Sequence, residues 1–101
     1  MFLIRDIMYC RPGKVRPMIE RFVAMARISE KAGMGKMRVT TDVAAEQFWT
    51  IVSEMEVESI DDFMKMDAGM DPEVAKQFEE LMKDYHELVD HGRREIYKIE
   101  T

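Results

Sequence analysis

The sequence has 101 residues, 47% of them hydrophobic, and a formal net charge of −5. This length and composition fit one globular domain spanning residues 1–101. The acidic balance argues against a nucleic-acid-binding protein, which gains affinity from Lys and Arg contacts with phosphates, and against docking on an anionic membrane. No apolar run approaches the roughly 20 residues of a membrane-spanning helix. We therefore expect no nucleic-acid partner and no membrane partner.

Cysteine usage and the N-terminus bear on the cellular compartment. Cys10 is the only cysteine, so the chain forms no internal disulfide, which is typical of proteins in a reducing compartment. Met1–Asp6 has no basic region before its first charges, unlike a signal peptide. We therefore expect a cytoplasmic protein. The eleven methionines favour a methionine-rich core over an adaptable ligand pocket.

The first half of the chain predicts a strand, a helix and a second strand. Phe2–Cys10 alternates with apolar side chains on both faces, as a central strand does. Arg11–Lys14 contains Pro and Gly and turns the chain. Val15–Lys31 carries apolar residues at helical spacing, and Gly33 fits the C-cap of that helix. Met37–Asp42 alternates as a strand.

The second half predicts the same order of elements. The longest expected strand, Gln47–Glu58, is apolar on one face and acidic on the other. A short helix is expected over Ser59–Met66, with the first serine as its N-cap. Apolar residues at helical spacing predict a longer helix over Pro72–His91, which Gly92 would end. A final strand is expected over Arg94–Glu100.

This order predicts an α+β fold, βαββαβ, in which a split β-α-β unit occurs twice. The four strands would form an antiparallel sheet with both helices on one face. Five side chains of the longest strand should face the helices: Trp49, Ile51, Ser53, Met55 and Val57.

The other face of this sheet has no helix to cover it. A small domain rarely leaves a largely apolar sheet face in water, so we expect two copies to close face to face as a homodimer. Glu54 and Glu56 lie on that face. They are expected to pair with Arg5, Arg38 or Arg94, across strands or across the dimer.

Two short motifs carry a resemblance to a known group of proteins. They are the turn Arg11-Pro12-Gly13-Lys14 after the first strand and the junction Val57-Glu58-Ser59-Ile60-Asp61-Asp62-Phe63 after the third. With Phe22 at the centre of the first helix, the chain resembles the dimeric α+β barrel superfamily, which includes the antibiotic-biosynthesis-monooxygenase, NIPSNAP-like and EthD-like families. The resemblance covers nearly the whole chain and implies a ferredoxin-like fold and a barrel-forming homodimer. It does not fix an activity, because the group mixes several kinds of enzyme.

The haem-degrading members differ from this chain at specific positions. They carry a Trp just before the Glu-Ser of the junction, where this sequence has Val57. They also carry an Asn in the first strand, which is missing from Phe2–Cys10, and a histidine closer to the junction than His86. The resemblance therefore does not extend to haem, and no cofactor is predicted.

Cofactor-free oxygenases of this group hold an electron-rich aromatic substrate between sheet and helices. The residues here that would line such a cavity, beside Val57, are Phe22, Trp49, Ser53, Met55 and Tyr85. His86 borders the apolar stripe of the second long helix, and histidine is the side chain best suited to acid–base catalysis near neutral pH. We predict it as the catalytic residue. In the alternative interpretation the aromatic residues belong to the core and Ser53 hydrogen-bonds locally.

Two further clusters of polar residues could hold a chemical site. In Tyr85–His91, one helical face carries His86 and Asp90, and another carries Glu87 and His91. The two faces lie about 100° apart around the helix. A single metal ion could not contact all four of these side chains, so no metal site is predicted. His91 is interpreted as a charge near the C-terminal end of the helix dipole. The acids of the longest strand are interpreted as ion-pair partners rather than catalysts.

The sequence leaves two hypotheses of different classes. The leading one is a cofactor-free monooxygenase-like or isomerase-like enzyme acting on a small organic molecule in a sheet–helix cavity. The alternative is a non-catalytic ligand-binding or accessory homodimer, in which side chains fill that region. An open cavity of a few hundred Å³ would favour the first hypothesis, and solid packing would favour the second.

Overall fold

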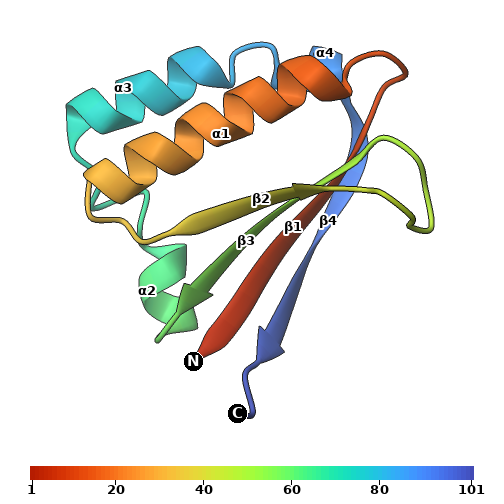
Figure 1. Ribbon diagram of the computed structural model, residues 1–101. Coiled ribbons are helices and arrows are strands. Elements are labelled where there is room, and N and C mark those ends of the chain that lie inside the picture. The colour runs from red at the N-terminus through yellow and green to blue at the C-terminus, as the bar shows by residue number, and fades with distance from the viewer.

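The computed structural model describes residues 1–101, and its strands form one antiparallel sheet in the order β2-β3-β1-β4. The elements in chain order are β1 (Phe2–Cys10), α1 (Val15–Lys31), β2 (Met37–Thr41), β3 (Thr50–Val57), α2 (Ile60–Met64), α3 (Pro72–Leu81), α4 (Tyr85–Leu88) and β4 (Val89–Lys98). Helices α1 and α3 lie side by side over one face of the sheet (Figure 1). The predicted ferredoxin-like α+β fold is therefore confirmed.

Local side-chain and backbone chemistry sets several of these boundaries. At the end of α1, the Gly33 N–H donates to the Glu30 carbonyl (3.2 Å) and the Met34 N–H donates to the Ser29 carbonyl (2.9 Å). This pair of bonds is a Schellman motif, and Gly33 has the left-handed φ of 72° that the motif requires. Ser59 caps α2 as predicted, since its hydroxyl accepts from the Asp62 N–H at 3.2 Å.

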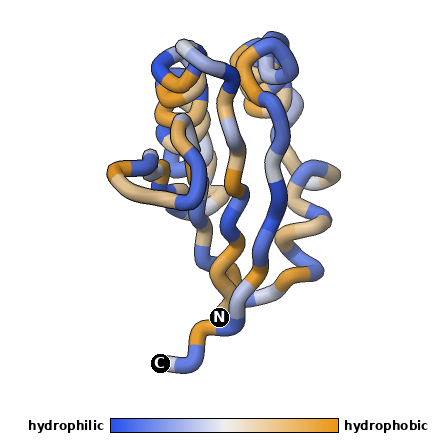
Figure 2. Tube along the Cα trace, turned by 90° about the vertical axis from the view of Figure 1, so that its right-hand side faces the viewer, coloured by the Kyte–Doolittle hydropathy of each residue, from blue (hydrophilic) through white to orange (hydrophobic).

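The core lies between the sheet and the helices. Met18 of α1 and Ile51 of β3 have no exposed surface. The buried cluster around them consists of Met8, Cys10, Met18, Phe22, Ile51, Leu88 and Val89. Hydrophobic and hydrophilic stretches alternate along the strands (Figure 2), because successive strand residues face opposite sides of the sheet. No helix is both long and apolar enough to cross a membrane.

The other side of the sheet carries no helix, and we call it the open face. The strand register places Arg5 between Glu54 of β3 and Glu95 of β4, and Ile7 between Val52 and Arg93 on the same side. The connection between β2 and β3, residues 42–49, folds over one end of this face. A small pocket of about 160 Å³ there is lined both by that connection and by the strands.

The third strand differs from its predicted form. It begins at Thr50 rather than Gln47, because Asp42 closes the preceding loop. The Asp42 carboxylate accepts from the Thr50 N–H at 2.8 Å, and the Thr50 hydroxyl donates to the Gln47 carbonyl at 2.9 Å. Trp49 therefore lies in the loop with a left-handed φ of 58°, and the prediction that it faces the helices from a strand is wrong.

The second long helix also differs. It was expected to run to His91, but α3 ends at Leu81, a single turn forms α4, and β4 already begins at Val89. The Leu88 carbonyl accepts from the Arg11 N–H at 2.9 Å, which draws the chain into the sheet. His91 and Gly92 are therefore strand residues.

An ion pair fixes the turn between α3 and α4, and it predicts a pH dependence. Arg21 of α1 donates to Asp84 through Nη2 (2.9 Å) and Nε (3.4 Å). These hydrogen bonds lower the pKa of the Asp84 carboxyl. A lowered folded-state pKa gives stability that is present above the unfolded pKa and lost as pH falls through the folded one. We expect Asp84→Asn to flatten the acid side of the stability profile in urea titrations below about pH 5. Lys65→Gln, which removes the exposed ion pair with Asp61, should change the pH dependence of stability little.

Candidate functional site

A cleft of about 540 Å³ lies at the end of the sheet where β1 stops and β3 and β4 start. Figure 1 shows the three chain segments meeting at that end. The lining residues are Tyr9, Cys10, Arg11, Pro12, Gln47, Phe48, Trp49, Asp90 and His91. The volume is within the usual range for small-molecule sites.

One wall of this cleft is aromatic and rests on an unusual backbone. Trp49 has φ 58°, a conformation that costs energy for any residue but Gly. Its carbonyl accepts from the Cys10 N–H at 2.9 Å, which ties the loop to the end of β1. Phe48 is 80% exposed and Trp49 46% exposed, with ring centroids 6.4 Å apart. The fold thus holds two large aromatic side chains in solvent beside a cleft, a pattern that marks binding sites.

The opposite wall is shaped by a β-bulge and a glycine. Tyr9 pairs with His91 and Cys10 with Val89, so Asp90 is the extra residue in β4. Bulges re-aim side chains and are frequent near active sites. Next to it, a Cβ on Gly92 would lie 2.7 Å from the Ile7 carbonyl oxygen, so only glycine allows β4 to approach β1 this closely.

Asp90 and His91 form a polar pair at the cleft. The His91 Nδ1 lies 2.7 Å from the Asp90 Oδ2, and the imidazole packs against Tyr9 with centroids 4.6 Å apart. An ionised carboxylate only accepts hydrogen bonds, so Nδ1 carries a hydrogen, and in the neutral imidazole the free lone pair is then on Nε2. The Arg11 Nη1 lies 3.8 Å from the Asp90 Oδ1, a loose pair with both side chains about half-exposed. This arrangement places an imidazole and a guanidinium at the cleft.

Cys10 also lines the cleft, but its thiol is not poised for nucleophilic chemistry. Burial, with a further contribution from Asp42, raises the pKa of the Cys10 thiol. A raised pKa depletes the reactive thiolate. This environment fits a structural role for Cys10.

The structure does not bring the sequence-predicted site residues together around one cavity. Phe22 and Ser53 are buried at 5% and 6% exposure, Phe22 within the core cluster. Burial raises the pKa of the Tyr85 hydroxyl, and His86 is exposed, with its ring edge-on to Tyr85 at 5.3 Å. Met55 is half-buried on β3, far along the strand from the Trp49 loop. The catalytic role of His86 and the binding roles of the others stay predictions.

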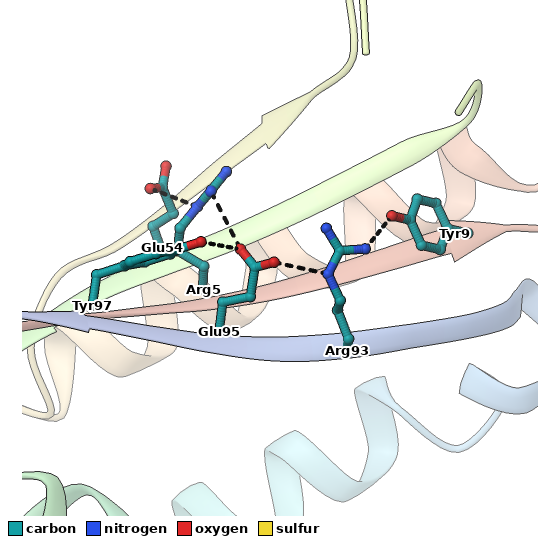
Figure 3. A network of polar contacts seen from close by, with 6 residues as sticks. All are labelled: Arg5, Tyr9, Glu54, Arg93, Glu95 and Tyr97. Atoms are coloured by element: carbon teal, nitrogen blue, oxygen red, sulfur yellow. Dashed lines mark hydrogen bonds and ion pairs between the residues drawn. The ribbon is translucent and has the colours of Figure 1, made fainter. Parts of the chain in front are cut away.

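A network of polar contacts covers the middle of the open face (Figure 3). The Arg5 Nε lies 3.4 Å from Glu54, and its Nη1 lies 3.7 Å from Glu95. Glu54 also pairs with Arg38 at 3.4 Å, so two of the expected partners are confirmed. Arg94 is not among them, because it lies on the helix side and donates to Asp6 at 2.6 Å.

Glu95 is the branch point of this network. It accepts from the Arg93 Nε and from the Tyr97 hydroxyl, each at 2.8 Å, and these bonds lower the pKa of its carboxyl. Arg93 in turn donates to the Tyr9 hydroxyl, and both hydrogen bonds raise the pKa of the guanidinium. The network therefore reaches from the centre of the open face to the cleft.

Sequence reasoning missed His91, Asp90 and Tyr9 as members of one site. The sequence feature that could have placed His91 in a strand is the neighbouring Gly92, since a glycine within a strand indicates a close backbone approach or a bulge. Gly92 is instead predicted from the sequence to end a helix. No sequence signal marks the left-handed Trp49, because its conformation depends on hydrogen bonds made by distant residues.

The chain shares its fold with solved structures at low sequence identity. A NIPSNAP-like domain protein from Burkholderia xenovorans has a TM-score of 0.73 and 16% identity, covering 99% of this chain and 85% of that one. A NIPSNAP family protein of unknown function from Agrobacterium tumefaciens has a TM-score of 0.74 and 17% identity, covering 98% and 87%. A proposed antibiotic biosynthesis monooxygenase from Deinococcus radiodurans has a TM-score of 0.69 and 12% identity, covering 100% and 94%.

No protein-family model matches the sequence, and no curated protein matches it. The structural likenesses extend over nearly the whole of each chain. The fold is thus the ferredoxin-like α+β fold of NIPSNAP-like and antibiotic-biosynthesis-monooxygenase-like proteins, the group that the sequence motifs resemble.

Proposed function

We propose that the protein is a small enzyme that uses His91 as a general base on an organic molecule bound in the cleft at Tyr9, Trp49 and His91. The observation that carries this proposal is the Asp90–His91 pair, with 2.7 Å between Nδ1 and the carboxylate, beside two exposed aromatic rings. A carboxylate that fixes the imidazole tautomer leaves Nε2 free to take a proton, as in other acid–base sites.

The reaction class is proton abstraction, which suits the isomerase-like form of the hypothesis. A weakly acidic C–H or O–H of the bound molecule gives its proton to the His91 Nε2, which leaves an enolate or phenolate and an imidazolium. Asp90 stabilises the imidazolium, and Arg11 stabilises the anion. Return of the proton to another carbon completes an isomerisation with no net change in charge. Phe48 and Trp49 hold the planar part of the molecule by stacking.

The protein is also proposed to act as a homodimer through the open face. By the strand register, that face carries three basic residues and three acidic ones, a self-complementary set: Arg5, Arg38, Arg93, Glu54, Glu56 and Glu95. A two-fold dimer places the same patch on both copies, so each cation can meet an anion of the other copy.

The test compares the two histidines of the chain. We expect the protein to catalyse deuterium exchange at the carbon next to the carbonyl of 2-indanone, a small aromatic ketone, followed by NMR. His91→Ala should slow this exchange at least about a hundredfold, the usual contribution of a general base. His86→Ala, a matched change at an exposed histidine away from the cleft, should leave it unchanged. If His86→Ala abolishes exchange and His91→Ala does not, the site lies where the sequence first suggested.

One observation favours the second hypothesis, a non-catalytic ligand-binding homodimer. Met18, Phe22 and Ile51 fill the layer between helices and sheet, where the enzymatic hypothesis first expected a cavity. A binding protein would take up the same aromatic probe in the cleft without accelerating its exchange. Fluorescence of Trp49, the only tryptophan, reports binding separately from turnover.

A further inference from the structure

We propose that Arg93 is a positioning residue for His91 and that it acts through the ring of Tyr9. This inference rests on the proposed role of His91 as a base. Arg93 does not line the cleft, but Figure 3 shows its guanidinium directed at the Tyr9 hydroxyl. Its effect on the cleft passes through that hydroxyl.

Tyr9 is held at its two ends. Its hydroxyl accepts a hydrogen bond from the Arg93 Nη1, and its ring packs against the imidazole of His91 at 4.6 Å with an angle of 37° between the planes. Tyr9 is only 7% exposed, and it is the cross-strand partner of His91 in the β1–β4 ladder. The ring therefore has one orientation, and that orientation sets the surface on which the imidazole rests.

Arg93 is itself fixed by the open face. Its Nε donates to Glu95 at 2.8 Å, and Glu95 is shared with Tyr97 and Arg5. A guanidinium presents its donors in a rigid planar fork, so fixing Nε also directs Nη1. Contacts thus run without interruption from Glu95 through Arg93 and Tyr9 to His91.

His91 needs this second constraint because its bond to Asp90 is exposed. Both side chains are more than half exposed, at 56% and 57%, and exposed charge pairs hold long-lived geometry poorly. The carboxylate fixes which nitrogen carries the hydrogen. The Tyr9 ring fixes where Nε2 points. Removing the hydroxyl partner frees the ring and lets the imidazole leave its productive orientation.

The experiment measures His91 by long-range proton–nitrogen NMR of the full chain labelled with ¹⁵N-histidine, at alkaline pH where imidazoles are neutral. In the unaltered protein we expect the Nδ1–H tautomer for His91. Arg93→Gln and Tyr9→Phe should each move its nitrogen shifts towards those of a free imidazole, with no further change in the double variant. Arg93→Lys, which still donates one hydrogen bond, should restore the shifts in part. His86 serves as the internal reference.

The same variants are assayed by 2-indanone exchange. Arg93→Gln should lower kcat about tenfold with KM nearly unchanged, because a misdirected base affects the reaction more than binding. Tyr97→Phe is the matched control, since it removes another hydrogen bond to Glu95 but leaves Tyr9 untouched. Unchanged His91 shifts in folded Arg93→Gln and Tyr9→Phe overturn the inference. If His91→Ala does not affect exchange, the proposed function fails. The ¹⁵N shifts of His91 still decide whether Arg93 positions the His91 ring.

Discussion

Gly92→Ala should destabilise the fold by about 2–3 kcal/mol, the upper range for overpacking a well-packed site. The added Cβ would meet the Ile7 carbonyl oxygen at 2.7 Å and the Met8 Cα at 3.3 Å, and both are backbone atoms of the central strand. Neither can move aside without breaking the β1–β4 ladder, so the two strands must separate locally. The measurement is urea unfolding followed by circular dichroism.

The matched control is Gly69→Ala. A Cβ there meets nothing within 4 Å, and Gly69 does not have a positive φ. It should change stability by less than about 1 kcal/mol, in either direction. Equal stability of the two variants would mean that β4 does not approach β1 as closely as described. Because His91 precedes Gly92, the same substitution should also weaken binding of aromatic probes to the cleft.

Arg5→Glu should weaken self-association at least about a hundredfold, because like charges facing one another across an interface cost several kcal/mol. Arg5 lies at the centre of the open face, 3.4 Å from Glu54 and 3.7 Å from Glu95. Its reversal gathers three carboxylates at one point, and two-fold symmetry repeats the cluster on the other copy. Sedimentation velocity over a range of concentrations gives the dissociation constants.

Lys65→Glu makes the same change in net charge on a different surface. Lys65 follows α2 and pairs with Asp61, with both side chains 72% exposed. The dimer dissociation constant of the Lys65→Glu variant should match that of the unaltered chain. A monomeric unaltered chain at micromolar concentration would remove the dimer proposal altogether. Urea unfolding of Arg5→Glu separates loss of the dimer from loss of the fold.

The parts of the fold that depend on neighbouring residues were predictable from the sequence. Gly33 and Met34 end α1 by donating to carbonyls three and five residues back, respectively, and Ser59 caps α2 through an amide three residues on. Strand alternation likewise placed Arg5, Glu54 and Arg38 on one face. In each case the physical cause lies within a few residues or in a simple period, so it is written in the local sequence.

The parts that depend on distant partners were not predictable. Helical spacing continues from Val74 through Leu81 and Tyr85 to Val89, yet the chain leaves the helix because Leu88 bonds to Arg11. Trp49 fits the alternation of a strand, yet Asp42 takes the Thr50 amide and closes a loop around it. The candidate site combines three such segments, so its members came together only in the folded chain.

The cleft has a consequence for how ligands can be found. Its walls come from residues 9–12, 47–49 and 90–91, which meet only when the central strand has both of its neighbours. A partly folded chain therefore offers no version of the site. Any molecule that binds it binds the native state alone, and at a concentration 100 times its Kd it adds about 2.7 kcal/mol to the free energy of unfolding. The melting temperature is thus a direct gauge of occupancy, and a compound library can be sorted by it before any reaction is known.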